Sequence, residues 1–260
     1  MIIYRNLNIK KNHKDSVVAI GNFDGLHVGH QKVLKEAKQK ARKNNLKFGL
    51  ITFEPAPTMF FNKTIKNHRI NSLKQKIYFL KKMKLDFVVI INFNKNFSNL
   101  SPVGFIKKIL FKKIKSKYIF VSKNFKFGKK RLGDINTLKN LEKKYFYKTV
   151  ITAPYKKENK IVSSSLIRKI IYQGRVKEAE KLLGRTWSVE GLVVKGDQRG
   201  RKIGFPTCNI KLNSYTIPKL GVYSVWVQIN NLKKRGIANV GFRPTFNGKS
   251  LLLEVNIFGI

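Results

Sequence analysis

Apolar segments of strand length alternate with amphipathic segments of helical period over the first two-thirds of the chain. The apolar segments occupy residues 17–20, 48–53, 87–93, 118–121 and 150–152. Between the first two of them, residues 30–43 carry apolar side chains at helical spacing and lysines on the other face. A further helix is expected after Ser101, which can cap it, with Pro102 in its first turn. This alternation predicts a doubly wound parallel α/β sheet, in which ligands bind at the carboxyl ends of the strands.

The pattern changes after Ser163. Residues 163–173 and 176–183 have the pattern of two short helices that stop at Gly174 and Gly184. From about Trp187 onward, short β-like runs alternate with glycine-rich turns, which is typical of a small antiparallel barrel or sandwich. The sequence therefore predicts two domains, residues 1–185 and residues 186–260.

The net charge of +42 has two interpretations. Nucleic-acid binding is one, because neutralised phosphates dominate such affinity. Compositional drift is the other, because Lys, Asn, Ile and Phe are all abundant and Lys far exceeds the Arg that base-reading surfaces favour. We favour drift and expect no specific nucleic-acid partner. The charge would still attract anionic small molecules such as ATP.

The sequence also indicates a cellular location. Cys208 is the single cysteine, so no intramolecular disulfide can form, which is compatible with a reducing compartment. No apolar run reaches the length of about 18 residues that a membrane span needs. The first residues lack the apolar core and cleavage site of a signal peptide. We therefore expect a cytoplasmic protein without a membrane partner; its oligomeric state is not predicted.

Residues 21–30 read GNFDGLHVGH and follow the apolar run 17–20. His27 and His30 are three residues apart, whereas helical zinc sites use histidines four apart with a further ligand, so a metal site is not favoured. A strand end, glycines and a helix start are the features of an anion site, and Gly29 would let a nucleotide approach the backbone. From the residues alone, a phosphate site and an incidental glycine-rich turn stay equally open. The GKS at 248–250 is no P-loop, because Arg243 stands where that motif needs glycine.

Longer stretches match one family in order along nearly the whole chain. They include GNFDGLHVGH, TFEPAPTMFF (52–61), HRINSLKQKIYFL (68–80), NFKFGKKRLGD (124–134), SSSLIRKIIYQG (163–174), GFPTCNI (204–210) and LEVNIF (253–258). These motifs are similar to those of the prokaryotic bifunctional riboflavin kinase/FAD synthetase family. The resemblance implies a Rossmann-like nucleotidyltransferase domain followed by a riboflavin kinase-like antiparallel β-barrel. It also implies that riboflavin is phosphorylated to FMN and FMN adenylylated to FAD, with ATP as co-substrate and Mg²⁺ as cofactor.

For the first domain, the resemblance implies that His27 and His30 donate to the phosphates of ATP and that Arg168 is a fixed cation for the triphosphate. It implies a nucleotide pocket formed by Gly21, Asn22, Phe23, Asp24, Gly25, Gly29, Asn124 and Ser164. Taken without the motif, Arg168 would be interpreted as a surface arginine on a basic helix.

For the second domain, the resemblance implies a loop over the ATP phosphates formed by Gly196, Asp197, Arg199, Gly200, Arg201 and Gly204. Thr207 and Asn209 would engage Mg²⁺, for which oxygen donors are suited. Glu254 would be the catalytic base for the riboflavin hydroxyl. Strand periodicity alone predicts only an outward polar residue at Glu254. Cys208 would lie on the opposite strand face from Thr207 and Asn209, as a packing residue.

Three departures from the family pattern lead to expectations. Ala56 stands where the family usually has histidine, which would weaken flavin or nucleotide binding in the first domain, and Ser122 stands where glycine is usual. Family members usually continue past the LEVNIF strand, so we expect an incomplete barrel and an impaired kinase half.

Two alternative functions remain open at this stage. One is a basic nucleic-acid-binding protein on a nucleotidyltransferase-like fold. The other is an adenylyltransferase for another substrate, such as a pantetheine phosphate or nicotinamide mononucleotide, against which the GFPTCN motif argues.

Overall fold

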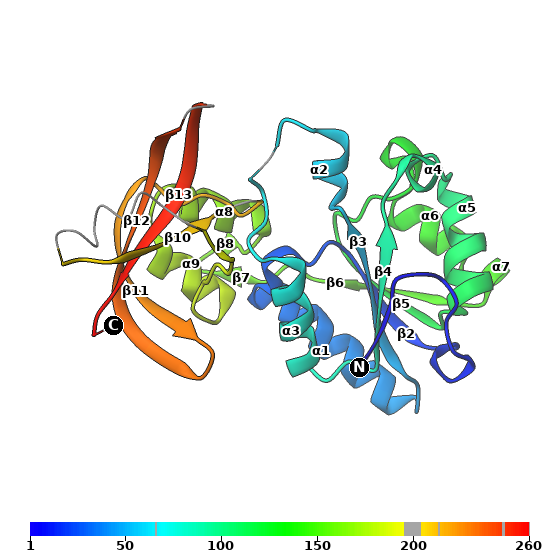
Figure 1. Ribbon diagram of the computed structural model, residues 1–260. Helices are drawn as coiled ribbons and strands as arrows, with labels where there is room; N and C mark the ends of the chain where they lie inside the picture. The colour runs from blue at the N-terminus through cyan, green and yellow to red at the C-terminus, as the bar shows by residue number, and fades with distance from the viewer. Residues whose placement is uncertain (66, 195–203, 213, 246–247, 260) are drawn as a thin grey trace. The chain divides into compact units, whose positions relative to one another are not determined.

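The computed structural model describes residues 1–65, 67–194, 204–212, 214–245 and 248–259 (Figure 1). The chain divides into two compact units. The first unit consists of Met1–Ile65 and Leu73–Ser163, and the second of Lys66–Ser72 and Ser164–Ile260. No helix in these described ranges is long and apolar enough to cross a membrane.

The first unit contains a six-stranded sheet in the order β1-β4-β3-β2-β5-β6. Its strands are β1 (Ile2–Tyr4), β2 (Val17–Ile20), β3 (Phe48–Glu54), β4 (Phe87–Asn92), β5 (Tyr118–Ser122) and β6 (Lys148–Thr152). All neighbouring pairs in this order are parallel, which confirms the predicted α/β sheet. The sequence-based prediction missed β1, a three-residue strand at the edge of the sheet. The run 17–20 is therefore the second strand and not the first.

Helices cover both faces of this sheet (Figure 1). The helices are α1 (Val28–Lys43), α2 (Pro57–Phe61), α3 (Leu73–Lys82), α4 (Lys95–Ser98), α5 (Pro102–Phe105), the π-helical η3 (Ile106–Ile114), α6 (Ile135–Asn140) and α7 (Glu142–Tyr145). Alternate strand residues enter two separate core clusters: Val18 and Ile20 pack with η3, whereas Val17 and Ala19 pack with α1 and α3. This is why the strands read as continuous apolar runs.

The strand order creates a topological switch at β2. From β2 the chain continues into β3 and β4, which lie on one side of β2 within the sheet. The next strand, β5, pairs with the opposite edge of β2. Ligands bind in such sheets at the carboxyl ends of the strands where the order reverses. Residues 21–30 follow β2 and Asn124 follows β5, so both stretches lie at this switch.

The described residues of the second unit form two helices and an antiparallel sheet. α8 (Ser164–Tyr172) and α9 (Val176–Leu183) precede Gly174 and Gly184, whose φ angles of 79° and 68° are left-handed, as expected of glycine stops. The sheet order is β11 (Gly221–Ile229), β12 (Leu232–Thr245), β13 (Gly248–Ile257), β10 (Thr207–Lys211) and β9 (Val193–Val194). This confirms antiparallel strands in this region, and the described pairings form an open five-stranded order with β11 and β9 at its edges.

A segment between α2 and α3, which we call the strap (residues 67–72), belongs to the second unit. Ile70 is fully buried, and its carbonyl accepts a hydrogen bond from Trp187 Nε1 at 3.0 Å. Arg185 donates to Asn71 Oδ1 at 2.8 Å. Burial lowers the pKa of Arg185 to about 10, so this side chain remains a cation at neutral pH. The strap is thus built into a unit that otherwise begins at Ser164.

The compact units divide at Ser163/Ser164, whereas the domain boundary predicted from the sequence lies at 185/186. The second compact unit contains α8 and α9 together with the antiparallel sheet, whereas the predicted boundary places both helices in the first domain. The assignment of residues 1–185 and 186–260 as functional domains stays a prediction.

Candidate active sites

The turn after β2 is held in an unusual backbone conformation. Phe23, Gly25 and Leu26 have φ angles of 47°, 77° and 40°, all in the left-handed region that non-glycine residues rarely adopt. The Asn22 carbonyl accepts hydrogen bonds from Thr52 Oγ1 at 3.2 Å and from Lys76 Nζ at 2.8 Å. These contacts connect the turn to β3 and α3 and fix its position.

The turn leads directly into α1, whose N-cap is His27. His27 Nδ1 accepts a hydrogen bond from the main-chain N–H of His30 at 3.3 Å. Since Nδ1 is the acceptor, a neutral His27 carries its proton on Nε2, which can donate to an anion. The two imidazoles stack with centroids 3.6 Å apart, and His27 is buried. A paired donor site at a helix N-terminus is suited to phosphate.

Gly29 has a steric reason to be glycine. A Cβ atom there would lie 3.1 Å from His27 Nδ1 and 3.4 Å from Tyr155 Cβ. A side chain at this position would therefore press on the His27 ring. The sequence predicts that Gly29 lets a nucleotide approach the backbone. The nearby His27 ring is a second reason why a side chain is unfavourable at this position.

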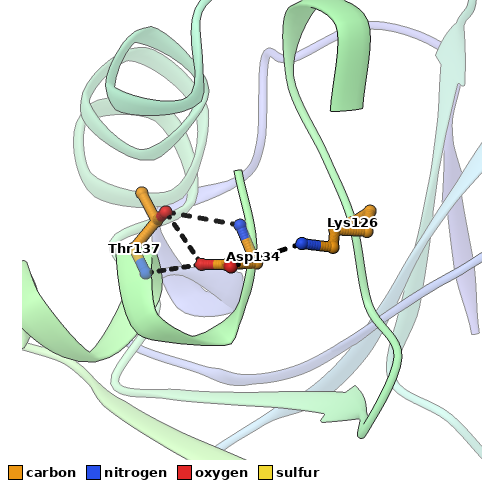
Figure 2. A network of polar contacts seen from close by, with 3 residues as sticks. All are labelled: Lys126, Asp134 and Thr137. Atoms are coloured by element: carbon orange, nitrogen blue, oxygen red, sulfur yellow. Dashed lines mark hydrogen bonds and ion pairs between the residues drawn. The ribbon is translucent and has the colours of Figure 1, made fainter. Parts of the chain in front are cut away.

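The loop after β5 carries Asn124, which is exposed. Its base is closed by Phe127 and Gly133, which exchange two main-chain hydrogen bonds of 2.9 Å. Asp134 then caps α6 by accepting from Thr137 N at 3.0 Å, and its other oxygen pairs with Lys126 Nζ at 3.3 Å (Figure 2).

The Thr137 N–H, the Thr137 hydroxyl and Lys126 lower the pKa of the Asp134 carboxyl, in that order of importance. A lowered pKa in the folded state means that the cap contributes stability above the ordinary aspartate range and loses it as pH falls through the folded pKa. The anchor of the Asn124 loop is thus ionised at neutral pH.

A cluster of phenylalanines lies at the carboxyl ends of β3 and β4, and the sequence analysis did not identify it. It consists of Phe53, Phe60, Phe61, Phe93 and Phe97, with ring centroids 5.3–6.0 Å apart. Phe61 is 67% exposed. The Phe-rich stretches TFEPAPTMFF and NFNKNF were the available signal, but period alone does not distinguish a core aromatic from an exposed one.

The two departures in the first domain lie next to these features. Ala56 is the N-cap of α2 and makes no side-chain capping bond, and Ser122 is the last residue of β5. The weakened binding expected from Ala56 stays a prediction.

Ser164 and Arg168 both lie on α8, in the second unit. Arg168 Nε donates to the main-chain oxygen of His68 in the strap at 2.8 Å. Arg168 is partly buried and held by this main-chain contact, and its role toward the triphosphate stays a prediction.

The antiparallel sheet brings a polar row together. Asn209 on β10 and Asn239 on β12 both pair in register with Glu254 on β13. Residues directly opposite on neighbouring strands share a face, so Glu254 lies between the two amides. Thr207 shares that face, two residues before Asn209 on β10. The Asn209 side chain is 5% exposed, and its Oδ1 is buried without a hydrogen-bond partner within the described part of the chain.

Cys208 lies on the opposite face, in register with Val255. Burial raises the pKa of its thiol, which lowers the thiolate fraction and agrees with a packing residue rather than a nucleophile.

Most of the predicted phosphate loop of the second domain lies outside the described residues. This applies to Gly196, Asp197, Arg199, Gly200 and Arg201. Gly204 is described and has a φ of 80°, a left-handed conformation that favours glycine.

Comparison with known proteins identifies the family. The family model described as FAD synthetase matches residues 9–166, and the one described as riboflavin kinase matches residues 183–260. The chain belongs to the bifunctional riboflavin kinase/FMN adenylyltransferase family. The two matches confirm the resemblance, with the β2 turn and Asn124 in the first match and the Asn209–Glu254 row in the second. Arg168 lies between the two matched ranges.

Curated members of this family are similar over most of the chain. The protein of that name from Buchnera aphidicola subsp. Schizaphis graminum is 40% identical over 255 residues, which are 96% of this chain and 82% of the relative. The Haemophilus influenzae protein is 36% identical over 242 residues, with 93% and 79% covered. The Escherichia coli K12 protein is 34% identical over 245 residues, with 94% and 78% covered.

A solved structure has a fold similar to that of this chain. It is described as a macrolide-efflux protein from Streptococcus pneumoniae and is 34% identical. The superposition has a TM-score of 0.84 and covers 100% of this chain and 84% of that one.

Proposed function

We propose that this chain makes FAD from riboflavin in two steps. Residues 186–260 phosphorylate riboflavin with ATP, and residues 1–185 transfer the adenylyl group of a second ATP to FMN. The observation that carries the second step is the stacked His27–His30 pair at the N-terminus of α1, at the topological switch of the parallel sheet. Such a position favours the phosphates of a nucleotide.

In adenylyl transfer, a phosphate oxygen of FMN attacks the α-phosphorus of ATP. The new P–O bond forms as the bond to the β-phosphate breaks, and pyrophosphate leaves. The reaction needs stabilisation of developing negative charge more than covalent chemistry by the protein. His27 donates from Nε2 and His30 donates beside it. Arg168 supplies a fixed cation for the triphosphate.

The pocket residues position the two substrates. The turn from Gly21 to Gly25, together with Gly29, shapes the nucleotide pocket, and Asn124 and Ser164 contribute polar contacts. The phenylalanine cluster supports flavin binding, since its exposed ring at Phe61 offers an aromatic surface to the isoalloxazine ring. Its place at the carboxyl ends of β3 and β4 favours this role.

In riboflavin phosphorylation, Glu254 accepts the proton of the 5′-hydroxyl while that oxygen attacks the γ-phosphorus of ATP. The bond between the γ-phosphorus and the bridging oxygen breaks, and ADP leaves. The phosphate loop, with Gly204 at its end, covers the phosphates. Thr207 and Asn209 fit a magnesium ion, because Asn209 Oδ1 is a buried oxygen that lacks a partner within the described residues. Magnesium bound there would neutralise charge on the ATP phosphates.

The proposed partners are ATP, riboflavin and FMN. A cytoplasmic location agrees with the single cysteine, Cys208. We still interpret the net charge of +42 as a result of compositional drift and not as a sign of nucleic-acid binding.

Two separate assays test this function. The purified chain is incubated with FMN, ATP and Mg²⁺, and separately with riboflavin, ATP and Mg²⁺, and the flavins are separated by chromatography. We expect FAD from the first mixture and FMN followed by FAD from the second. The rate of FMN formation also decides whether the kinase half is impaired. Steep salt-dependent DNA or RNA binding with no flavin turnover would support the nucleic-acid alternative instead.

Replacing Asn209 with leucine is expected to act on function and stability in opposite directions. The Mg²⁺ concentration for half-maximal riboflavin phosphorylation should rise about tenfold, as for other lost metal-site contacts. The free energy of unfolding without Mg²⁺ should rise, because a buried unpaired polar group costs about 1–3 kcal/mol. Magnesium titrations and urea unfolding measure the two effects.

The control for this variant is Ser224→Ala, at an exposed position on β11. A leucine variant with unchanged magnesium dependence would remove Asn209 from the metal site.

A further inference from the structure

One lysine of α3 is buried, unlike the others on that helix. Lys76 is 6% exposed, whereas Lys74, Lys81 and Lys82 are exposed. Burying an ammonium group costs free energy unless it is paired or hydrogen-bonded. The stability of an amphipathic helix does not require this burial, and the chemistry described above does not use Lys76.

Lys76 contacts the main chain of the nucleotide turn. Its Nζ donates to the Asn22 carbonyl at 2.8 Å. Thr52 on β3, which is also buried, donates from Oγ1 to the same carbonyl at 3.2 Å. Two donors from two elements therefore converge on one oxygen, and a charged donor makes the stronger bond.

The clamped carbonyl belongs to the peptide that enters Phe23, whose φ is 47°. Leu26, three residues on, has a φ of 40°. Left-handed conformations are unfavourable for both residue types and persist where surrounding contacts hold them. His27 follows at once as the N-cap of α1. Loss of the clamp would let the turn relax and move the His27 ring.

We propose that Lys76 is a positioning residue for adenylyl transfer: its ammonium group holds the Asn22 carbonyl, and through it the strained turn that places His27 and His30. Thr52 contributes the weaker part of the same clamp. The inference rests on the proposed role of the two histidines.

Lys76→Met is the main test, with Lys81→Met as a control on the same helix. We expect Lys76→Met to lower kcat/KM for FMN adenylylation about ten- to a hundredfold, the range expected when a charged hydrogen bond is lost. Riboflavin phosphorylation, which takes place in the other domain of the same chain, should stay unchanged. Lys81→Met should leave both reactions unchanged.

Hydrogen exchange gives a readout that does not depend on activity. In Lys76→Met, amides of residues 21–27 should exchange faster while those of β3 keep their protection. A purely structural role would instead speed exchange throughout the first unit. Lys76→Arg should restore part of the rate because it keeps a charged donor. Thr52→Val should give a smaller loss of the same kind and remains informative if Lys76→Met fails to fold.

The outcomes separate this inference from the proposed function. If replacing His27 and His30 leaves FAD synthesis unchanged, the proposed function of the turn fails. If those replacements abolish FAD synthesis while Lys76→Met and Thr52→Val change neither kinetics nor exchange at residues 21–27, only the role of Lys76 is overturned.

Discussion

Replacing His27 and His30 together with alanine is expected to lower FAD synthesis from FMN and ATP by at least about 100-fold. Loss of a single transition-state donor typically has an effect of this size. His27 presents Nε2 as a donor because its Nδ1 accepts from His30 N. Initial rates of FAD formation measure the effect. Riboflavin phosphorylation and the circular dichroism spectrum should be retained.

Two further variants separate donation from other roles of this pair. His27→Asn keeps a side chain that caps α1 but removes the Nε2 donor. FAD synthesis by this variant should therefore stay slow, as in the double alanine variant. Lys35→Ala removes an exposed charge from the same helix and should have little effect. A mild effect of the double alanine variant would return GNFDGLHVGH to the glycine-rich turn that the sequence left open.

Glu254→Gln is expected to lower riboflavin phosphorylation by about 100- to 10,000-fold, the range that general-base catalysis contributes. The amide keeps the size of the side chain but does not accept the proton of the 5′-hydroxyl. FMN adenylylation should continue at the rate of the unchanged protein. Measuring both reactions on one preparation makes the second domain's loss visible against the first domain's activity.

The control for this prediction is Glu158→Gln, at an exposed carboxylate. If Glu254→Gln phosphorylates riboflavin within a few-fold of the unchanged protein, Glu254 is only the polar strand residue that periodicity suggests. In that case the alignment of Glu254 with Asn209 and Asn239 would have no catalytic meaning.

Much of the fold could be predicted because the local pattern of the chain is strong. The runs 17–20 and 48–53 are strands with nearly the predicted ends, since strands buried on both faces need apolar side chains at every position. The helix after Ser101 begins as expected, with the Ser101 hydroxyl accepting from Gly104 N at 3.0 Å. β1 was missed because three residues are too few to show a period.

The candidate sites were predictable only in part. The β2 turn and the pair at Thr207 and Asn209 were identified through motifs that resemble one family. Lys76 and three phenylalanines of the cluster also lie in family-like stretches, but nothing in those stretches singled out these side chains. A lysine in a lysine-rich helix and phenylalanines in Phe-rich stretches look ordinary until their exposure and partners are known.

By itself, the sequence determined the element types, the change from an α/β to an antiparallel region, and the family. The tertiary structure alone decided three things: the strand order that makes β2 a switch, the strap at residues 67–72 that joins the second unit, and the register that aligns Glu254 with Asn209. The physical reason is the separation in sequence between the residues that decide each property. Element type follows from side-chain period over a few neighbours, whereas pairing and burial depend on which distant surfaces pack together.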